Sequence, residues 1–315
     1  MSATFWSVIG GCGMSLPNKV IKNNDLAETL DTNDEWIRTR TGIEQRHIAS
    51  QSDSVALLGT NAANNALLAA KVAAADVDMI ILATTSPDHF MPATATKIQH
   101  QLGATKACAF DIQAVCSGFI YALSIADQFI KTGAMSNVLV IGAELMSRMV
   151  DWNDRSTCVL FGDGAGAVLL RRSLEPGILS THLFTDGAGY DMLFVDHSDE
   201  KFKRGKIVMN GRAIYSTAIN VMESSIKTAL THNNLNITDI DWFVAHQANK
   251  RIIDSVSTKL GIPSEKTVVT INSYANTSAA TIPISLAVTN INKGDLVILS
   301  AMGAGYAWGS AAIRW

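Results

Sequence analysis

The sequence predicts an α/β protein built from two similar halves. Short apolar runs alternate along the chain with longer segments of helical periodicity, and several of the runs recur about half a chain later. Runs of continuous apolar residues are typical of strands in sheets that are covered by helices on both faces. The chain has 315 residues, of which 48% are hydrophobic and 17% charged. The charged fraction is below the roughly 25% of typical soluble proteins, so we expect part of the surface to be buried in an oligomer.

Five segments are predicted as strands because they are apolar or β-branched and are bounded by Asp, Asn or Gly. They are residues 79–82, 138–141, 167–170, 242–244 and 296–299. Four longer segments have the apolar spacing of helices. They are residues 54–70, 118–132, 211–233 and 250–260. No Pro-, Ser- or Gln-rich linker separates the elements, so we expect the two halves to be tightly joined.

An internal repeat divides the chain. Residues 76–81 resemble 239–244, residues 137–141 resemble 295–299, and residues 161–166 resemble 302–306, in the same order in both halves. Residues 151–160 have no counterpart in the second half. The order of the matches indicates duplication of one αβ unit, with a first half of residues 1–172 and a second half of residues 173–315.

The same repeat predicts where the chemistry lies. Residues 110–116 align with 270–276, and both segments are predicted to run from a strand through a turn into a helix. Cys116 ends the first segment, Asn276 ends the second, and His246 follows the predicted strand at 242–244. Loops at the ends of strands often carry functional residues. We therefore expect Cys116, His246 and Asn276 to form one site across a pseudo-twofold axis.

These three residue types suit acyl chemistry. A thiol at the N-terminus of a helix meets the positive end of the helix dipole, which favours the nucleophilic thiolate of Cys116. An Asn amide cannot act as a base, but Asn276 and a neutral His246 can both donate hydrogen bonds to one oxygen. Such donors stabilise an enolate or an oxyanion. The remaining thiols are expected to be inert and reduced: Cys12, Cys108 and Cys158.

Composition and spacing exclude several other functions. The net charge of −3 and the pI near 6.2 argue against a nucleic-acid-binding protein. No Cys/His cluster has the spacing of zinc ligands, so we expect no metal. The glycines at 162, 164 and 166 precede a predicted strand instead of a helix, which argues against a dinucleotide cofactor. No apolar run is long enough to span a membrane and no signal peptide is recognisable, so we expect a cytoplasmic protein.

Three short segments leave two interpretations open. Trp36 and Arg40 are suited to stacking on a base and holding a phosphate, or they belong to an ordinary surface helix. Lys250 and Arg251 bind an acidic partner, or they form a solvated charged turn. Residues 303–305 supply backbone N–H groups to an oxyanion, or they form a tight turn between strands.

Six motifs together resemble the β-ketoacyl-acyl carrier protein synthase III family of the thiolase superfamily. They are residues 34–36 with 40–43, 116–119, 161–166, 246–249, 276–280 and 308–310. The resemblance extends over essentially the whole chain. It implies a thiolase-like five-layered αβαβα fold of two duplicated halves and a homodimer.

The resemblance also implies a reaction. Cys116, His246 and Asn276 are then a catalytic triad in which Cys116 takes an acyl group, usually acetyl, from acyl-CoA. His246 and Asn276 hold the thioester carbonyl of malonyl-acyl carrier protein while carbon dioxide leaves. The product is a 3-ketoacyl-carrier protein, made in the first condensation of type II fatty-acid synthesis. The backbone N–H groups of Cys116 and Ala304 form the oxyanion hole, and no cofactor is needed beyond the CoA thioester substrates.

The implied binding residues fall into three groups. CoA is bound by Trp36 and Arg155, which sandwich the adenine, and by Thr32, Arg40, Asn210, Gly211 and Asn249. The acidic acyl carrier protein contacts Gln247, Ala248, Asn249, Lys250 and Arg251. Met91 lies near the acyl pocket across the dimer.

The chain departs from well-known members of the family at three of these places. Met91 stands where Phe is frequent, Ala304 where Gly is frequent, and Ser216 where some members have a Lys. Methionine is flexible and repacks easily, so Met91 affects the preferred length of the acyl chain. Ala304 retains its N–H but has fewer accessible φ angles than Gly. Ser216 removes one positive charge from the predicted carrier-binding surface.

Three alternatives to an initiating synthase remain. The first is a relative from a secondary-metabolite pathway, which would keep Cys116 and His246 but use a different acceptor. The second is a Cys–His hydrolase, although the local Cys signature of the papain-like proteases is absent. The third is a binding module without catalysis, against which the complete set of Cys116, His246 and Asn276 argues.

Overall fold

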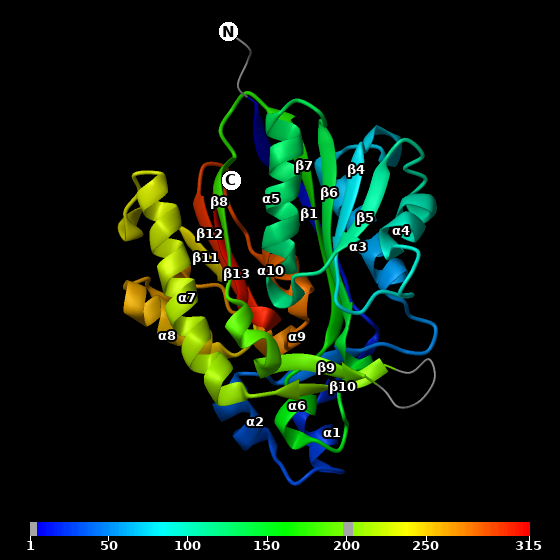
Figure 1. The fold of residues 1–315 in the computed structure, drawn as a ribbon, viewed down its shortest axis with the longest axis vertical. Helices are drawn as coiled ribbons and strands as arrows, with labels where there is room; N and C mark the ends of the chain where they lie inside the picture. Colours follow the sequence, from blue (N-terminus) through cyan, green and yellow to red (C-terminus); the bar gives the residue numbers. More distant parts are fainter. Residues whose placement is uncertain (1–4, 198–203) are drawn as a thin grey trace.

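Two mixed β-sheets alternate with three layers of helices (Figure 1). The computed structural model describes residues 5–197 and 204–315. The first sheet takes its strands from residues 6–173 and the second from residues 178–314. The expected five-layered α/β architecture is confirmed.

The first sheet has five strands in the order β1-β7-β6-β4-β5. They are β1 (Trp6–Ser15), β7 (Asp163–Ser173), β6 (Asn137–Leu145), β4 (Met79–Ala83) and β5 (Cys108–Ile112). Strand β6 pairs in parallel with β4, which pairs in parallel with β5, whereas β7 runs antiparallel to both of its neighbours. All residues of β4 are buried, as continuous apolar runs predict.

The second sheet repeats this pattern with one strand fewer. Its strands are β11 (Trp242–Ala245), β12 (Leu296–Gly303), β13 (Ala307–Arg314) and β8 (Ile178–Thr185). Strand β12 pairs in parallel with β11 and antiparallel with β13, as β6 does with β4 and β7. The expected strand at the start of residues 270–276 is wrong. The segment just before it makes a single β-bridge, between Phe243 and Thr267. Ile271–Tyr274 forms the short helix α9.

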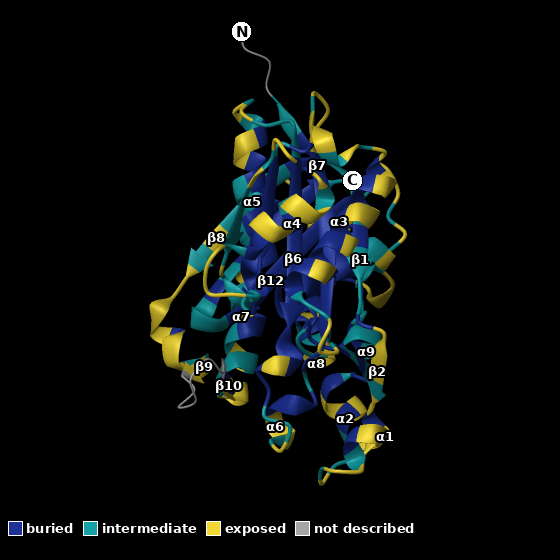
Figure 2. Ribbon diagram, turned by 90° about the vertical axis from the view of Figure 1, so that its right-hand side faces the viewer, coloured by how far each residue is buried: buried dark blue, intermediate teal, exposed yellow. Residues whose placement is uncertain are grey.

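Two helices fill the space between the sheets. They are α5 (Gly118–Lys131) and α10 (Thr281–Val288). One apolar cluster joins side chains of both helices to β4 and β6 on one side and to β11 and β12 on the other. The centre of the molecule is accordingly buried (Figure 2), and the two halves share one core.

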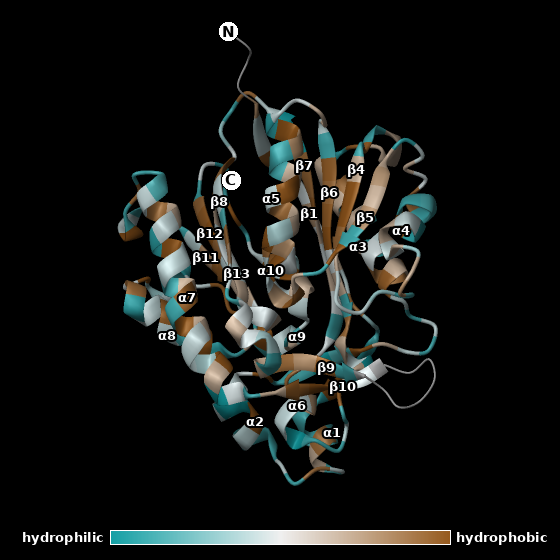
Figure 3. Cartoon of the chain, viewed as in Figure 1, coloured by the Kyte–Doolittle hydropathy of each residue, from teal (hydrophilic) through white to brown (hydrophobic). Residues whose placement is uncertain are grey.

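The outer faces of the sheets are covered by two further pairs of helices. They are α3 (Val55–Ala70) with α4 (Thr94–Leu102), and α7 (Gly211–His232) with α8 (Lys250–Leu260). Each helix buries its apolar side against a sheet, and its polar side faces outward (Figure 3). Local sequence sets the boundaries, because the Ser54 hydroxyl accepts from Leu57 N at the start of α3 and Gly261 ends α8 with φ 72°.

Small elements form a cap at one end of the layers (Figure 1). They are β2 (Lys19–Lys22), α1 (Asn23–Ala27), α2 (Asp34–Thr41), β3 (Gln45–Ile48), α6 (Arg155–Cys158), β9 (Leu193–His197) and β10 (Arg204–Met209). The buried guanidinium of Arg46, in β3, joins three of these segments, because it donates to Ile21 O in β2, Asn23 Oδ1 in α1 and Val159 O directly after α6. Within the described residues, no helix is long and apolar enough to cross a membrane.

Candidate active site

Cys116 lies between the first sheet and the central helix α5. It occupies the 3-10 turn η2 (Val115–Ser117), directly before α5 begins at Gly118. The preceding residue, Val115, has φ 48°, which is a strained angle for a β-branched side chain. The strained turn aims the thiol into the interior, where only 6% of Cys116 is exposed.

Asn276 lies in the second half, between the short helix α9 and the 3-10 turn η7 (Ser278–Ala280). Its preceding residue, Ala275, has φ 56°, so a left-handed residue precedes both Cys116 and Asn276. The Asn276 Oδ1 atom accepts a hydrogen bond of 2.8 Å from Ser278 N. Because this bond uses the oxygen, the Nδ2 group of Asn276 supplies the hydrogen-bond donors.

His246 follows β11, and its backbone N–H donates to Ser300 O at 2.8 Å. Burial lowers the pKa of His246 from 6.5 to about 3, so the imidazole is neutral at physiological pH. Its Nδ1 atom lies 2.6 Å from the Thr281 hydroxyl, which is 3.1 Å from Ser278 O. The Thr281 hydroxyl donates to Ser278 O in this geometry, so an imidazole that donates from Nε2 requires the hydroxyl to donate to Nδ1 instead.

The three predicted residues meet in one cavity of about 150 Å³. Cys116, His246 and Asn276 all line it, and each is at most 6% exposed. Gly303 lies at the same place, because a Cβ atom on it would come 2.8 Å from Cys116 N. The end of β12 can approach the nucleophile only because residue 303 has no side chain, and this brings Ala304 to the wall of the cavity.

A second, larger cavity of about 720 Å³ also borders Cys116. Cys116, Phe161 and Ala304 line both cavities, so the thiol lies where they adjoin. The smaller cavity extends towards Gly211 and Asn249 at α7 and α8, and the larger one reaches Phe90 on the surface.

The residues expected to bind CoA cluster near the cap. The Arg155 guanidinium lies 4.9 Å from the Trp36 ring centroid, and that of Arg40 lies 5.9 Å from it. A planar base between Trp36 and Arg155 needs about 7 Å, the sum of two stacking distances, so Arg155 must move outward to form the expected sandwich. The Asn249 amide donates to Arg40 O at 3.1 Å, which ties this cluster to the start of α8.

Two other expected residues lie at the start of a helix and in the cap. Asn210 caps α7, because its Oδ1 accepts from Ala213 N at 3.2 Å. The Thr32 hydroxyl is buried and has no hydrogen-bond partner among the described residues.

The segment expected to contact a carrier protein is partly buried. Gln247 is 1% exposed, its Nε2 donates to Ala245 O and Val268 O, and its Oε1 accepts from Thr270 N and Ile271 N. This amide therefore holds the chain together internally and is not available to a partner, which corrects the expectation for Gln247. On the surface, Lys250 pairs with Asp254 at 2.7 Å, and the Arg251 guanidinium lies 5.5 Å from the Tyr215 ring centroid.

Phe90 and Met91 form an apolar surface beside the larger cavity. They are 97% and 84% exposed. Phe90 lines the larger cavity, whereas Met91 is not among the residues that line either Cys116 cavity in the described part of its own chain. An exposed pair of this size is unusual on a solvated surface.

Sequence reasoning missed three polar residues close to the site: Glu144, Ser278 and Thr281. Glu144 is completely buried at the end of β6, and Ser278 and Thr281 follow Asn276. A carboxylate at the end of an otherwise apolar strand was a usable signal. Within the described residues, no group of three or more His, Cys, Asp or Glu side chains is placed to hold a metal ion.

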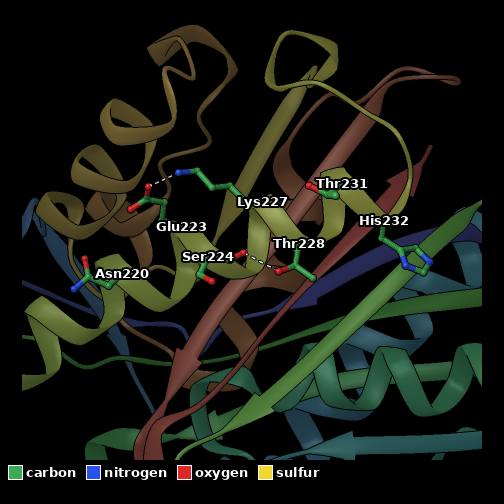
Figure 4. A pocket seen from close by; sticks show the side chains of 7 residues that line it. All are labelled: Asn220, Glu223, Ser224, Lys227, Thr228, Thr231 and His232. Carbon is green, nitrogen blue, oxygen red and sulfur yellow. Dashed lines mark hydrogen bonds and ion pairs between the residues drawn. The ribbon is translucent and has the colours of Figure 1, made fainter.

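A polar hollow on the outer side of α7 is separate from this site. Its lining side chains all come from α7 (Figure 4): Asn220, Glu223, Ser224, Lys227, Thr228, Thr231 and His232. Glu223 pairs with Lys227 at 2.7 Å and with Lys259 at 3.1 Å. The charges of Glu223 and Lys227 in this hollow are thus already paired. We assign the hollow no chemistry.

Replacing Thr281 with valine is expected to slow the step that needs the Nε2 proton of His246. Loss of the hydroxyl removes the donor to Nδ1, so the imidazole proton can move to Nδ1 and Nε2 no longer donates. Changes to such orienting partners typically cost 10–100-fold in activity. The measurement is the single-turnover rate of the second half-reaction, with Thr281→Ser, which keeps the hydroxyl, as the matched control. Equal rates for the valine and serine variants would contradict this role.

The comparison with known proteins agrees with the geometry of the site. The family model described as 3-oxoacyl-[acyl-carrier-protein (ACP)] synthase III matches residues 110–187, and its C-terminal model matches residues 230–315. The chain is 50% identical to the β-ketoacyl-[acyl-carrier-protein] synthase III of Paramagnetospirillum magneticum, over 98% of both chains. It is also 50% identical to that of Ehrlichia canis, over 98% of this chain and 99% of the relative.

Solved structures give the same result. The 3-oxoacyl-[acyl-carrier-protein] synthase III of Aquifex aeolicus superposes with a TM-score of 0.95 at 45% identity, over 98% of this chain and all of that one. The priming β-ketosynthase of the R1128 polyketide pathway superposes with a TM-score of 0.94 at 32% identity, over 98% of this chain and 96% of that one.

Proposed function

Because the chain belongs to the 3-oxoacyl-[acyl-carrier-protein] synthase III family, we propose that Cys116, His246 and Asn276 join an acyl group from acyl-CoA to malonyl-acyl carrier protein. The protein is an acyltransferase of the condensing type, and its reaction initiates type II fatty-acid synthesis. The observation that carries the assignment of residues is the meeting of these three side chains in one buried cavity. The substrates are CoA and carrier-protein thioesters, and the mechanism uses no further cofactor.

The first half-reaction is acyl transfer to Cys116. The Cys116 sulfur attacks the thioester carbonyl, the carbonyl oxygen becomes an oxyanion, and the CoA thiolate leaves. The N–H groups of Cys116 and Ala304 are the proposed donors to that oxyanion. The absence of a side chain at Gly303 supports this arrangement, because it lets the two backbone segments come into contact. The acyl chain then extends into the larger cavity.

The second half-reaction is decarboxylation and condensation. The carbon–carbon bond to the malonyl carboxylate breaks, carbon dioxide leaves, and the electron pair passes to the thioester as an enolate. His246 Nε2–H and Asn276 Nδ2–H donate to the enolate oxygen. Both are neutral donors in a buried cavity, which suits an oxygen that gains charge during the reaction. The α-carbon attacks the acyl-Cys116 carbonyl and releases the Cys116 thiolate and the 3-ketoacyl product.

The smaller cavity is the proposed pantetheine tunnel. It leads from Cys116 to Gly211 and Asn249, and Asn249 bonds to the segment that carries Arg40 and Trp36. The adenine of CoA then lies at Trp36, between the indole and an Arg155 that has moved outward. Both thioesters enter by this route, one after the other.

Arg155→Ala is expected to raise the KM for acyl-CoA without changing the rate of condensation. Loss of one side of the adenine site removes a stacking contact of about 1–3 kcal/mol, which corresponds to roughly 5- to 150-fold in KM. Steady-state kinetics with acyl-CoA, and separately with preformed acyl-enzyme and malonyl-carrier protein, separate the two effects. The exposed Arg38→Ala in the same helix as Trp36 is the control. An unchanged KM would exclude Arg155 from the CoA site.

The carrier protein docks, in this proposal, on the surface made by Ala248, Asn249, Lys250 and Arg251 at the start of α8. Lys250 and Arg251 supply positive charge to an acidic partner on an enzyme with a net charge of −3. Two copies of the chain form a homodimer around Phe90 and Met91, which a solvated monomer would leave 97% and 84% exposed. We place the enzyme in the cytoplasm, in keeping with four cysteines that form no disulfide.

Mass spectrometry of the intact protein tests the function. Wild-type protein mixed with acetyl-CoA is expected to gain one acetyl group on Cys116, and malonyl-carrier protein is expected to discharge it as acetoacetyl-carrier protein. A panel of longer acyl-CoAs sets the preferred chain length, which Met91 influences. An adduct formed only from longer acyl-CoAs, or one that malonyl-carrier protein cannot discharge, would favour the secondary-metabolite alternative. The 50% identity to synthases III, against 32% to the polyketide priming enzyme, favours the first outcome.

A further inference from the structure

Tyr215, on α7, contacts the arginine at the start of α8. The Arg251 guanidinium lies over the Tyr215 ring, 5.5 Å from its centroid. The Tyr215 hydroxyl lies 3.2 Å from the hydroxyl of Ser255, one turn further along α8. The ring is half-buried and packs against the apolar cluster that joins α7 to α8, which lie side by side (Figure 1). Packing and this polar contact together hold the ring in place beneath an exposed cation.

The same tyrosine lines the smaller cavity, which is the proposed pantetheine tunnel. Asn249 and Ile252, on either side of Arg251 in the sequence, line this cavity as well. Arg251 itself is exposed. It therefore lies at the outer edge of the tunnel wall, where a carrier protein rests once its pantetheine arm is inside.

The charge of Arg251 is available to a partner, whereas that of Lys250 is engaged. The Lys250 ammonium group lies 2.9 and 2.7 Å from the two carboxylate oxygens of Asp254. Arg251 forms no ion pair with the part of the chain that the structure describes. Of the two cations expected to meet an acidic carrier protein, Arg251 is thus the one whose charge is not already neutralised.

An aromatic support makes this charge more effective. An arginine side chain has many rotamers, and holding it still in a complex costs conformational entropy. A guanidinium that already lies over a ring has lost part of that freedom before the partner arrives. This advantage applies to the carrier protein alone, because the nucleotide end of CoA has its own proposed site at Trp36 and Arg155. The two thioesters share the tunnel but differ in what stays outside it.

We propose that Tyr215 is a positioning residue that holds Arg251 for the carrier protein, so that the enzyme favours a malonyl group on the carrier protein over one on a carrier-free thioester. The proposal rests on the proposed function and concerns only the second substrate. Arg251 contacts the carrier protein, and Tyr215 acts through Arg251.

The KM values for two malonyl substrates test this role. One substrate is malonyl-carrier protein, and the other is malonyl-pantetheine, which has no carrier. The deciding quantity is the KM for malonyl-carrier protein divided by the KM for malonyl-pantetheine, because any effect of Tyr215 on the shared tunnel cancels in this ratio. Tyr215→Leu is expected to raise the ratio about 2- to 10-fold, since Arg251 must then be ordered during binding.

Further variants distinguish positioning from a role in the tunnel wall. Tyr215→Phe keeps the ring and is expected to restore the wild-type ratio. If Tyr215 only lines the tunnel, both KM values will rise together in Tyr215→Leu, and the unchanged ratio would overturn the proposal. Arg251→Ala is expected to raise the ratio at least as far as Tyr215→Leu does. Adding Tyr215→Leu to Arg251→Ala should raise it no further, and a further rise would show that Tyr215 does not act through Arg251.

Surface variants keep the test independent of folding. Arg251→Lys retains the charge but lacks the planar group that stacks on a ring, so its ratio is expected to rise as in Tyr215→Leu. This exposed substitution decides the question if Tyr215→Leu does not fold, and a wild-type ratio in it would contradict the proposal. Lys227→Ala is the control, because it removes a cation elsewhere on α7 that is paired with Glu223. It is expected to keep the wild-type ratio.

The same measurements separate failure of this proposal from failure of the proposed function. A wild-type protein that forms no 3-ketoacyl product from either malonyl substrate would disprove the function itself. A wild-type protein that condenses both substrates, with a ratio that neither Tyr215→Leu nor Arg251→Lys changes, would disprove only the positioning role.

Discussion

Cys116→Ala is expected to abolish acyl-enzyme formation, so that the mass of the protein stays unchanged after incubation with acetyl-CoA. Cys116 is the nucleophile proposed for the first half-reaction, and its cavity offers His246 and Asn276 only as neutral hydrogen-bond donors. Removal of a covalent nucleophile typically lowers kcat by on the order of 10⁵–10⁶-fold. Intact-protein mass spectrometry and the rate of CoA release measure the loss.

Cys158→Ala is the matched control for this variant. Cys158 is also completely buried, in α6 of the cap, away from the two cavities of the active site. It is expected to keep a single acetyl adduct. An adduct of one acetyl group on Cys116→Ala, or its loss from Cys158→Ala, would show that the nucleophile has been misassigned.

The architecture was predictable because both sheets are covered on both faces. Strands β4, β6 and β12 therefore read as continuous apolar runs, and residues 79–82, 138–141 and 296–299 all fall within them. The helices at 54–70 and 250–260 were predictable from their caps and apolar spacing. Strand β13 was missed because its small residues, such as Gly309 and Ser310, do not distinguish a strand from a loop.

The second half departs from the duplicated pattern for a local reason. The counterpart of β5 does not form as a strand, since Gln247 accepts hydrogen bonds from Thr270 N and Ile271 N and donates to Val268 O. These are backbone groups that a strand would pair with its neighbour. The buried side-chain amide of Gln247 thus takes the hydrogen bonds that a neighbouring strand would otherwise make. Nothing in the sequence of residues 267–272 predicts this arrangement.

The reacting residues and the residues that support them differ in how far the sequence predicts them. The repeat aligned Cys116 with Asn276, but their turns are not equivalent, because Cys116 lies in η2, two residues before α5, whereas Asn276 precedes η7 and lies five residues before α10. The close packing of η7 on β6, in contrast, depends on the absence of a Cβ atom at Gly142. Such a contact between distant segments has no signature in local sequence.

Asn276→Ala and His246→Ala are expected to acylate but to stop before condensation. The acetyl group is accepted by Cys116 and the backbone donors of the oxyanion hole, which neither variant changes. The enolate oxygen loses one donor in each variant, and loss of one such donor typically costs 10²–10³-fold. The acetyl-enzyme should therefore form at near wild-type rate and persist after malonyl-carrier protein is added, as mass spectrometry can follow.

Asn276→Asp separates the donor from the local fold. The aspartate keeps an oxygen for the bond from Ser278 N but has no N–H, so it should fail to condense as Asn276→Ala does. In the wild type, His246 stays neutral down to a pH well below 5, because a group with a pKa near 3 gains its second ring proton only there. Condensation of preformed acetyl-enzyme should thus show no loss between pH 8 and pH 5 from protonation of this residue. A rate that falls with a pKa near 6.5 and becomes level in His246→Ala would show instead that His246 works as a base, and the role of neutral donor would be wrong.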